Sequence, residues 1–398
     1  MKLLAIPLLI AAVGSSLFSS LIPASAQTWT QTSAPITNWT AIASSADGVK
    51  LVAVASGGAI YTSTNSGASW APATNAPDQA WRAVASSANG NKLIAAVRGG
   101  GIYRSVDSGL TWTQTGASSN AWISITSSAD GNKLAAVASI FPPPDFFTSS
   151  DSGTTWITNG SPYDRWLAIA ASADGNTLVA CGGLGTILAS TNAGNSWTTN
   201  DIVGGTSSSA ASSADGSRLV VTGIVAGGGR ICLSTNSGLA WTQTNAPSVG
   251  PVALSADGTK LVAASSVSYS NNFPIYVSTD FGVTWTTNFP PGTNYWTGVV
   301  SSADGGKLAV IASGPGGGGI WTLQTAPAPQ MNTTPANGNL TLSWIIPSTN
   351  FVLEQNLDLT SMNWTDVTNM PVLNLTNLQD EVTLPLTNGS GFYRLATP

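Results

Sequence analysis

The stretch Ser63-Thr64-Asn65-Ser66-Gly67-Ala68-Ser69-Trp70 decides the fold, because its pattern, Ser-x-Asp/Asn-x-Gly-x-x-Trp, occurs six times at intervals of 41 to 44 residues. A fixed period of this length is typical of propellers, solenoids and arrays. In each octet the Asp or Asn is expected to fix a tight turn, the Gly to supply a positive φ, and the Trp to bury its ring. The defining residues are Asn65, Asp107, Asp151, Asn192, Asn236 and Asp280, with Trp70, Trp112, Trp156, Trp197, Trp241 and Trp285.

These octets resemble the Asp-box, or BNR-type, repeat of sialidases, xyloglucanases, sortilin-like receptors and photosystem II assembly-factor-like proteins. The resemblance implies a β-propeller in which the octet joins the third and fourth strands of a blade. It also implies a structural octet that lies away from the active face. Because the proteins that carry this repeat are so varied, the resemblance indicates the fold and says little about function.

A second repeated signal, Ala-Asp-Gly as at Asp47 or Ala-Asn-Gly as at Asn89, predicts a turn between the first and second strands of each repeat. The seventh repeat ends near Leu323 without an octet and has only three predicted strands. Residues Thr28–Thr32 resemble the ends of the other repeats and have no repeat before them. We therefore predict an all-β chain with a seven-bladed propeller, closed by the N-terminal strand.

The chain divides into four predicted parts. Residues 1–26 read as a signal peptide, since Lys2 precedes an apolar run and Ala24-Ser25-Ala26 resembles a cleavage site. The mature chain is then expected to be secreted, whether extracellular, at the cell surface or periplasmic. The propeller is predicted over 27–325, a Pro-rich linker over 326–336, and a small β-sandwich module over 337–398.

The C-terminal module ends in Phe392-Tyr393-Arg394-Leu395 and resembles modules appended to many secreted bacterial proteins. That resemblance implies no particular chemistry. Outside the signal peptide, no segment is apolar over the length that a transmembrane helix needs.

Composition narrows the classes of function. Charged residues make up 8% of the chain, the formal net charge is −5, and histidine is absent. The commonest general base and metal ligand is thus missing, and we assign no catalytic residue, metal or cofactor. Nucleic acid is not expected as a partner, and a monomer is expected. Cys181 and Cys232 align with apolar strand positions, which favours two buried thiols over a disulfide.

Candidate ligand residues are sought on one face. In an antiparallel blade the repeated turns and octets share one end, and the irregular loops share the other, where loops on a rigid scaffold carry function. Rings beside Asp, Asn and Arg suit a sugar or a peptide. The candidates on this variable face are Asp78, Arg82, Arg98, Asp145, Tyr163, Asp164, Arg165, Asp201, Arg230, Tyr269, Asn272 and Tyr295.

Three classes of function remain open. The first is a secreted, non-catalytic scaffold that binds a glycan or an extracellular protein. The second is a glycoside hydrolase, in which Asp78 with Asp164 or Asp201 could act as acid and base if about 5–9 Å apart. A sialidase is disfavoured because the propeller region contains no Glu. The third is a structural protein of the cell surface or matrix.

Overall fold

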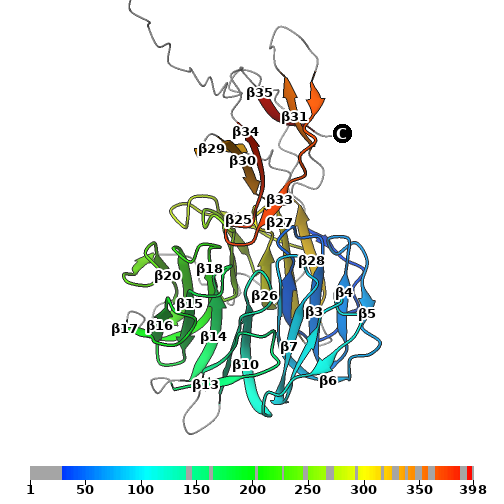
Figure 1. The fold of residues 1–398 in the computed structure, drawn as a ribbon. Helices are drawn as coiled ribbons and strands as arrows, with labels where there is room; N and C mark the ends of the chain where they lie inside the picture. Colours follow the sequence, from blue (N-terminus) through cyan, green and yellow to red (C-terminus); the bar gives the residue numbers. More distant parts are fainter. Residues whose placement is uncertain are drawn as a thin grey trace, which may run out of the picture.

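The computed structural model describes residues 29–139, 146–160, 165–201, 205–225, 228–244, 250–265, 273–291, 295–314, 318–324, 331–336, 339–345, 352–356, 364–385 and 392–396. These residues form strands, turns and loops and contain no helix, as the sequence predicts. The strands of the described propeller group into seven four-stranded antiparallel blades, arranged side by side around a ring (Figure 1).

The first four blades each use four consecutive strands, listed from the innermost to the outermost. They are β2 (Trp39–Ser44), β3 (Leu51–Gly58), β4 (Ile60–Ser63) and β5 (Ala71–Pro72); β6 (Gln79–Ser86), β7 (Leu93–Gly100), β8 (Ile102–Ser105) and β9 (Thr113–Gln114); β10 (Asn120–Ser127), β11 (Leu134–Ala138), β12 (Phe146–Ser149) and β13 (Ile157–Asn159); and β14 (Trp166–Ala171), β15 (Leu178–Gly182), β16 (Thr186–Ser190) and β17 (Thr198–Asp201).

Blades 5 and 6 follow the same order, and blade 7 draws on both ends of the propeller region. Their strands are β18 (Thr206–Ser212), β19 (Leu219–Val225), β20 (Gly228–Ser234) and β21 (Thr242–Thr244); β22 (Val252–Leu254), β23 (Leu261–Ala264), β24 (Ile275–Ser278) and β25 (Thr286–Asn288); and β26 (Tyr295–Ser301), β27 (Lys307–Ser313) and β28 (Ile320–Gln324) with β1 (Thr30–Gln31).

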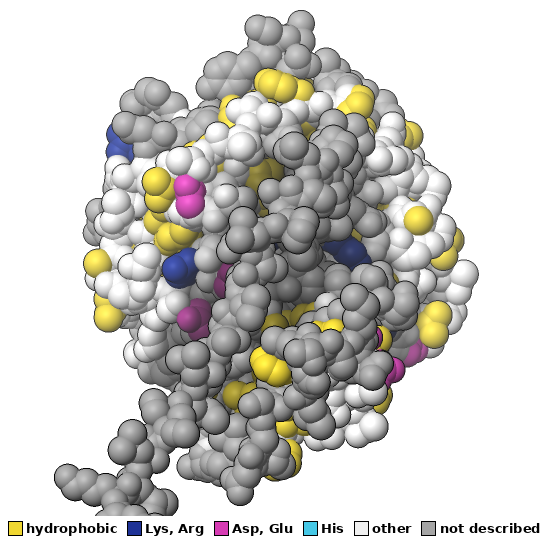
Figure 2. Space-filling model, turned by 90° about the horizontal axis from the view of Figure 1, so that it is seen from above, with side chains coloured by type: hydrophobic (Ala, Val, Ile, Leu, Met, Phe, Trp, Pro, Cys, Tyr) yellow, Lys and Arg dark blue, Asp and Glu magenta, His cyan; other side chains and the backbone are white. Residues whose placement is uncertain are grey.

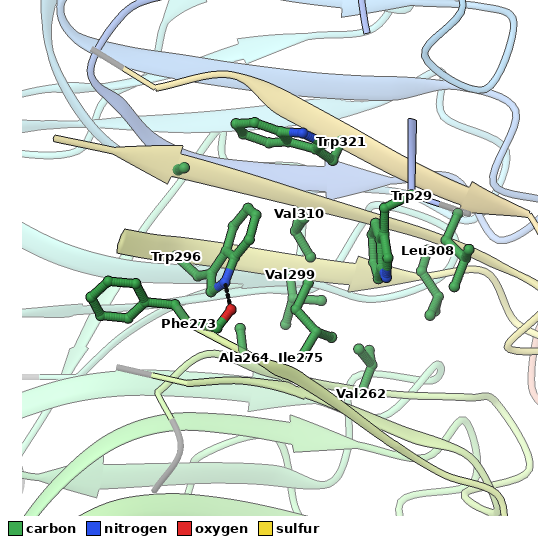
Figure 3. Packing of buried hydrophobic residues seen from close by; sticks show 12 residues of the cluster. Trp29, Val262, Ala264, Phe273, Ile275, Trp296, Val299, Leu308, Val310 and Trp321 are labelled. Atoms are coloured by element: carbon green, nitrogen blue, oxygen red, sulfur yellow. Dashed lines mark hydrogen bonds between the residues drawn. The ribbon is translucent and has the colours of Figure 1, made fainter. Parts of the chain in front are cut away.

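The N-terminal strand closes the ring. β1 is antiparallel to β28, with Thr30 opposite Thr322 and Gln31 opposite Trp321. Trp29 stands where an octet Trp would stand, and its ring packs in a core cluster that includes Trp296 and Trp321 (Figure 3). The last blade thus receives both the strand and the tryptophan that its own repeat lacks.

A ring of backbone hydrogen bonds joins the blades near the axis. The turn after each innermost strand contains an alanine whose N–H donates to the matching carbonyl of the next blade at 2.7 or 2.8 Å. The last bond, from Ala303 N to Ala46 O, spans the junction between blades 7 and 1. The side chains of these residues gather in one cluster, which only small residues can form so close to the axis. The ring consists of Ala46, Ala88, Ala129, Ala173, Ala214, Ala256 and Ala303.

The octets form the same corner whether the third residue is Asp or Asn. In blade 1, Ser63 Oγ donates to Asn65 Oδ1 (2.9 Å), and Asn65 Oδ1 also accepts from Ser69 N (2.9 Å). Gly67 N donates to Ser63 Oγ (2.9 Å), and the residue before this glycine, Ser66, already has a positive φ of 56°. The corner therefore uses two successive left-handed residues, of which the sequence pattern identifies only the glycine.

The octet tryptophans are buried less completely than the pattern predicts. Trp112 is 8% exposed, whereas the other five octet tryptophans are half-buried. The fully buried rings belong instead to the innermost strands, where Trp39 and Trp122 are 0% exposed. An innermost strand has neighbouring blades on both sides, while the octet corner lies at the outer end of one blade.

The two cysteines are free and buried in one cluster between blades 4 and 5, as expected from their repeat positions. Burial raises the pKa of the Cys232 thiol to about 11, so it stays protonated at neutral pH.

The C-terminal module consists of two sheets that share a core around Trp344. Met331–Ala336, expected in the linker, instead form a strand. It lies at the edge of its sheet, where Pro335 is tolerated. The first sheet has the order β29 (Met331–Ala336), β30 (Asn339–Ile345), β34 (Gln379–Pro385) and β33 (Val372–Asn374), and the second has the order β32 (Thr365–Asp366), β31 (Val352–Asn356) and β35 (Phe392–Ala396).

We expect Trp29→Ala to lower the free energy of unfolding by about 3–5 kcal/mol, the loss typical of a buried tryptophan. Chemical denaturation of the mature protein measures this value. Thr30→Ala, which alters an exposed side chain of the same strand, is the control and should change it by less than about 0.5 kcal/mol. A loss below about 1 kcal/mol for Trp29→Ala would contradict closure through this segment.

The octet carboxylates predict an acid-sensitive stability. Hydrogen bonds from the hydroxyl and N–H groups of Thr155 and Thr284 lower the pKa of Asp151 and Asp280 to about 2. In the unfolded chain an Asp has a pKa of about 3.9. These groups therefore stabilise the fold above about pH 4, and their contribution is lost as the pH falls toward 2.

The double variant Asp151→Asn/Asp280→Asn should retain the wild-type melting temperature at pH 7, because Asn65 makes the same bonds in blade 1. Between pH 4 and pH 2 its melting temperature should fall less than that of the wild type. Asp78→Asn, which changes an exposed carboxylate outside the octets, is the control. Identical pH slopes for the double variant and the wild type would show that these bonds do not couple to folding.

Candidate functional site

The two ends of the propeller differ in what they present. At one end stand the repeated turns, and the C-terminal module lies against this end, with β33 as its nearest strand (Figure 1). Leu373 and Leu378 of the module pack against the ring of alanines. Seen from the module's side, the charged side chains of both signs are scattered over the uncovered surface (Figure 2). The module thus covers the central end of the repeated-turn face and leaves the variable face to other contacts.

On the repeated-turn face the polar groups already have partners within the protein. Ser45 Oγ donates to Asp47 Oδ1, and Val49 N donates to the same oxygen at 2.9 Å. Lys50 Nζ reaches across to Asn91 Oδ1 of the next blade at 2.6 Å. Lys92 and Lys133 repeat this bond to Asn132 and Asn176. The turns and the lysines therefore join neighbouring blades, which is a structural use.

Small pockets recur at the blade junctions near this face. One is lined by Lys50 and Ser108, and a second is lined by the matching residues Lys92 and Ser152. Because they repeat with the blades, they are packing features of the propeller and not a single distinctive site.

At the variable end of the ring, which we call the mouth, the innermost strands of six blades contain a β-bulge near their first residues. In six blades the register of the innermost strand shifts by one residue after its first core position, for example between Trp39 and Ala41, whereas the described part of β22 in blade 6 pairs without such a shift. In blade 1 the extra residue contacts the following blade, because Thr40 Oγ1 donates to Trp81 O at 2.9 Å, whereas Ser208 of blade 5 bonds to Thr222 Oγ1 of its own blade. The bulged residues in the six blades where the structure describes this shift are Thr40, Arg82, Ile123, Leu167, Ser208 and Thr297.

Arg82 and Arg98 come together at this mouth, although 15 residues separate them in the sequence. Arg82 is the bulged residue of β6, between the pairs Trp81–Val97 and Ala83–Ala96. Arg98 directly follows Val97 on β7. Both side chains are exposed, yet the mouth surrounds Arg82 enough that desolvation, followed by the positive charge of Arg98, lowers the pKa of Arg82. Both remain charged at neutral pH.

The other described candidates lie on different blades. Asp78 is exposed just before β6, and Arg165 is exposed just before β14, where its carbonyl accepts from Gly183 N (2.8 Å). Tyr295, 57% exposed at the start of β26, packs against Phe273 with ring centroids 4.5 Å apart and the ring planes tilted by 48°. Tyr295 therefore presents an aromatic surface near the start of blade 7, away from the arginines of blade 2.

Two further candidates lie on outer strands. Asp201 ends the outermost strand of blade 4, opposite Thr186. Arg230 lies on β20 and donates to Gln243 Oε1 of β21 at 2.5 Å, so this arginine is held along the outer part of blade 5. The pair Asp78 and Asp201 is thus divided between the entry of blade 2 and the outer edge of blade 4. The remaining candidates, Asp145, Tyr163, Asp164, Tyr269 and Asn272, lie outside the described residues.

Repeat alignment alone missed two apolar residues of the mouth, Ile123 and Leu167. They occupy the same bulged position as Arg82 and are half-buried. The signal that could have found them is the position directly after the first tryptophan of each repeat.

The described residues offer neither a metal site nor a membrane-spanning helix. No three His, Cys, Asp or Glu side chains gather there as metal ligands do. The described part of the chain also contains no helix of the length and apolar character that crosses a membrane.

No family model matches the sequence, and no curated protein is significantly similar to it. Solved structures share its fold. YCF48 bound to D1 peptide aligns with a TM-score of 0.57 at 17% identity, over 75% of this chain and 96% of that one. YCF48 from Cyanidioschyzon merolae aligns with a TM-score of 0.57 at 16% identity, over 75% and 98%.

The GH74 xyloglucanase from Xanthomonas campestris aligns with a TM-score of 0.59 at 14% identity, over 80% of this chain and 59% of its own. At these identities the likenesses show the fold alone. The chain is a β-propeller similar in architecture to the YCF48 and xyloglucanase propellers.

We expect Leu373→Asp/Leu378→Asp to release the module from the ring of alanines, because two carboxylates cannot be buried against methyl groups without a large desolvation penalty. Limited proteolysis should then cleave between Gln324 and Met331 at least tenfold faster, while the propeller keeps its fold. Val372→Asp, at a 69% exposed position of the same strand, is the matched control. Equal cleavage of all three proteins would show that the two leucines do not hold the module.

Proposed function

We propose that the mature chain is a secreted, non-catalytic binding propeller that receives a protein or glycan ligand at its variable mouth. The observation that carries this proposal is the contrast between the two ends of the ring. One end repeats the same satisfied turns and carries the C-terminal module, whereas the mouth at the other end differs in almost every blade. A surface whose side chains vary on a regular scaffold is where a specific ligand is read.

Secretion is part of this proposal and rests on the signal-peptide pattern of residues 1–26. A mature chain in which charged residues are scarce and small hydroxyl side chains abound suits an extracellular surface. The proposed ligand is a protein segment or a glycan, because the mouth combines cationic, aliphatic and aromatic side chains, which suit both classes. YCF48, a fold neighbour, binds a D1 peptide, which is consistent with a protein ligand for a propeller of this shape.

The distribution of carboxylates supports a binding role over hydrolysis. A glycosidase holds two carboxyl groups about 5–10 Å apart across the scissile bond. Among the described residues of the propeller, the carboxylates outside the repeated turns and octets are Asp78 and Asp201, on blades 2 and 4. A pair divided in this way does not favour acid–base chemistry on one bond.

A bulky group attached at the mouth should abolish binding. Ser208 is exposed at the bulged position of blade 5, and the native Cys181 and Cys232 are buried, so Ser208→Cys can be labelled selectively with a polyethylene glycol maleimide. The matched control is Leu239→Cys, a 71% exposed octet position at the other end of the same blade. Ligands are sought on a glycan array and by capture from the native secretome, each with the mature protein.

We expect labelling at position 208 to weaken binding at least tenfold and labelling at position 239 to change it less than twofold. Equal binding by the two labelled proteins would place the ligand elsewhere. A mature protein that retains nothing from either source would overturn the binding role and favour a purely structural one.

A further inference from the structure

We propose that Arg82 and Arg98 form a site for a single oxyanion, a carboxylate, sulfate or phosphate group carried by the ligand. This inference rests on the proposed function, because it assigns the chemistry that one part of the mouth recognises. It places the site at the junction of blades 2 and 3.

The bulge places Arg82 at the edge of blade 2 that faces blade 3. Two other bulged residues contact the next blade: Thr40 Oγ1 of blade 1 donates to Trp81 O, and Thr297 Oγ1 of blade 7 donates to Trp39 O at 3.0 Å. Ser208 of blade 5 instead bonds to Thr222 of its own blade. Arg82 occupies the same position on blade 2. In blade 3 the residue equivalent to Trp81, which directly precedes Arg82, is Trp122.

Arg98 lies at the same junction because its strand, β7, changes the strand with which it pairs. Up to Val97 the strand β7 pairs with β6 of its own blade. Beyond that point it pairs with β10 of blade 3, so that Arg98 lies opposite Ala121, the residue before Trp122. Arg82 and Arg98 of blade 2 thus both lie beside the innermost strand of blade 3, near enough for the charge of Arg98 to act on Arg82.

The pair is charged, and no described carboxylate serves as its counter-ion. Neither arginine has a carboxylate or hydrogen-bond partner among the described residues. Other arginines are engaged: Arg104 donates to Thr154 Oγ1 at 2.8 Å, and Arg218 lies 5.2 Å from the ring centre of Phe281. Two like charges side by side repel each other. An anion placed between them is attracted to both, and this attraction outweighs their mutual repulsion.

The surroundings point to one oxyanion and not to a polyanion. A nucleic acid or a polysulfated chain needs a stripe of cations along its path. At the bulged positions on either side of Arg82 the residues are Thr40 and Ile123, which are uncharged. A guanidinium group presents a planar fork that matches two oxygens of a single anion. A ligand with one acidic group beside an apolar part therefore fits this pair and its half-buried neighbour Ile123.

The test uses the mature protein labelled with ¹⁵N-arginine, and follows the Nε–H resonances by nuclear magnetic resonance. Sulfate, inorganic phosphate, N-acetylglycine and glucuronate are titrated separately at constant ionic strength set with chloride. We expect saturable shifts of the Arg82 and Arg98 resonances, assigned from Arg82→Gln and Arg98→Gln, with Kd on the order of 1–10 mM for such small anions. Tighter binding of the two carboxylates indicates a carboxylate ligand, and tighter binding of sulfate or phosphate indicates an ester.

Each glutamine variant should weaken binding at least tenfold, while Arg104→Gln, with its partner on an octet, should leave the Kd unchanged. Shifts that do not saturate, that chloride reproduces, or that survive in Arg82→Gln would overturn the oxyanion site. If the anion titrations contradict the oxyanion site while labelling at position 208 still prevents ligand binding, only the oxyanion proposal is wrong and the proposed function stands. If the arginines bind the oxyanions but labelling at position 208 does not weaken binding of the ligand, the oxyanion site stands and the proposed function is contradicted.

Discussion

Seven hydrogen bonds between successive alanine backbones hold the propeller together at its axis, and the last of them crosses the junction between its first and last blades. In each bond the alanine N of one blade lies 2.7 or 2.8 Å from the alanine O of the next blade. The turns therefore approach closely, and the side chain at this position must be small. The same approach places the lysine of one blade on the asparagine of the next. Closure then removes the exposed strand edges that an open row of blades would leave.

This closed ring makes the two ends of the molecule unlike. Where the alanines converge, Leu373 and Leu378 of the C-terminal module cover them, and the turns are satisfied by their own serines and carboxylates. At the other end a bulge in the innermost strands of six blades inserts one extra residue at the mouth. Variation at that residue, from Thr40 to Arg82 to Ile123, changes the chemistry of the mouth without disturbing the core. The proposed binding role and the oxyanion site follow from this division.

Most of the propeller could be predicted from the sequence, because the octets, the Asp-Gly turns and the unmatched Thr28–Thr32 are local signals with a fixed period. Other features depend on partners that no local pattern reveals. The Pro-rich pattern predicts a linker where the strand that contains Pro335 lies, and Leu373, which packs against the ring of alanines, lies in a stretch without a period. Repeat alignment placed Arg82 and Arg98 on the same face but could not bring them together, because their meeting depends on a one-residue bulge and on β7 changing its partner.

The most direct test of the closed ring is hydrogen exchange of the alanine amides in the mature protein. A ring without a weak junction predicts that the amides of Ala303 and Ala46 exchange as slowly as those of Ala129 and Ala214, because all four donate the same bond. Local opening gives faster exchange in proportion to its population. Exchange of Ala303 a hundredfold faster than that of Ala129 would show that blades 7 and 1 separate, and would contradict a ring without a weak junction.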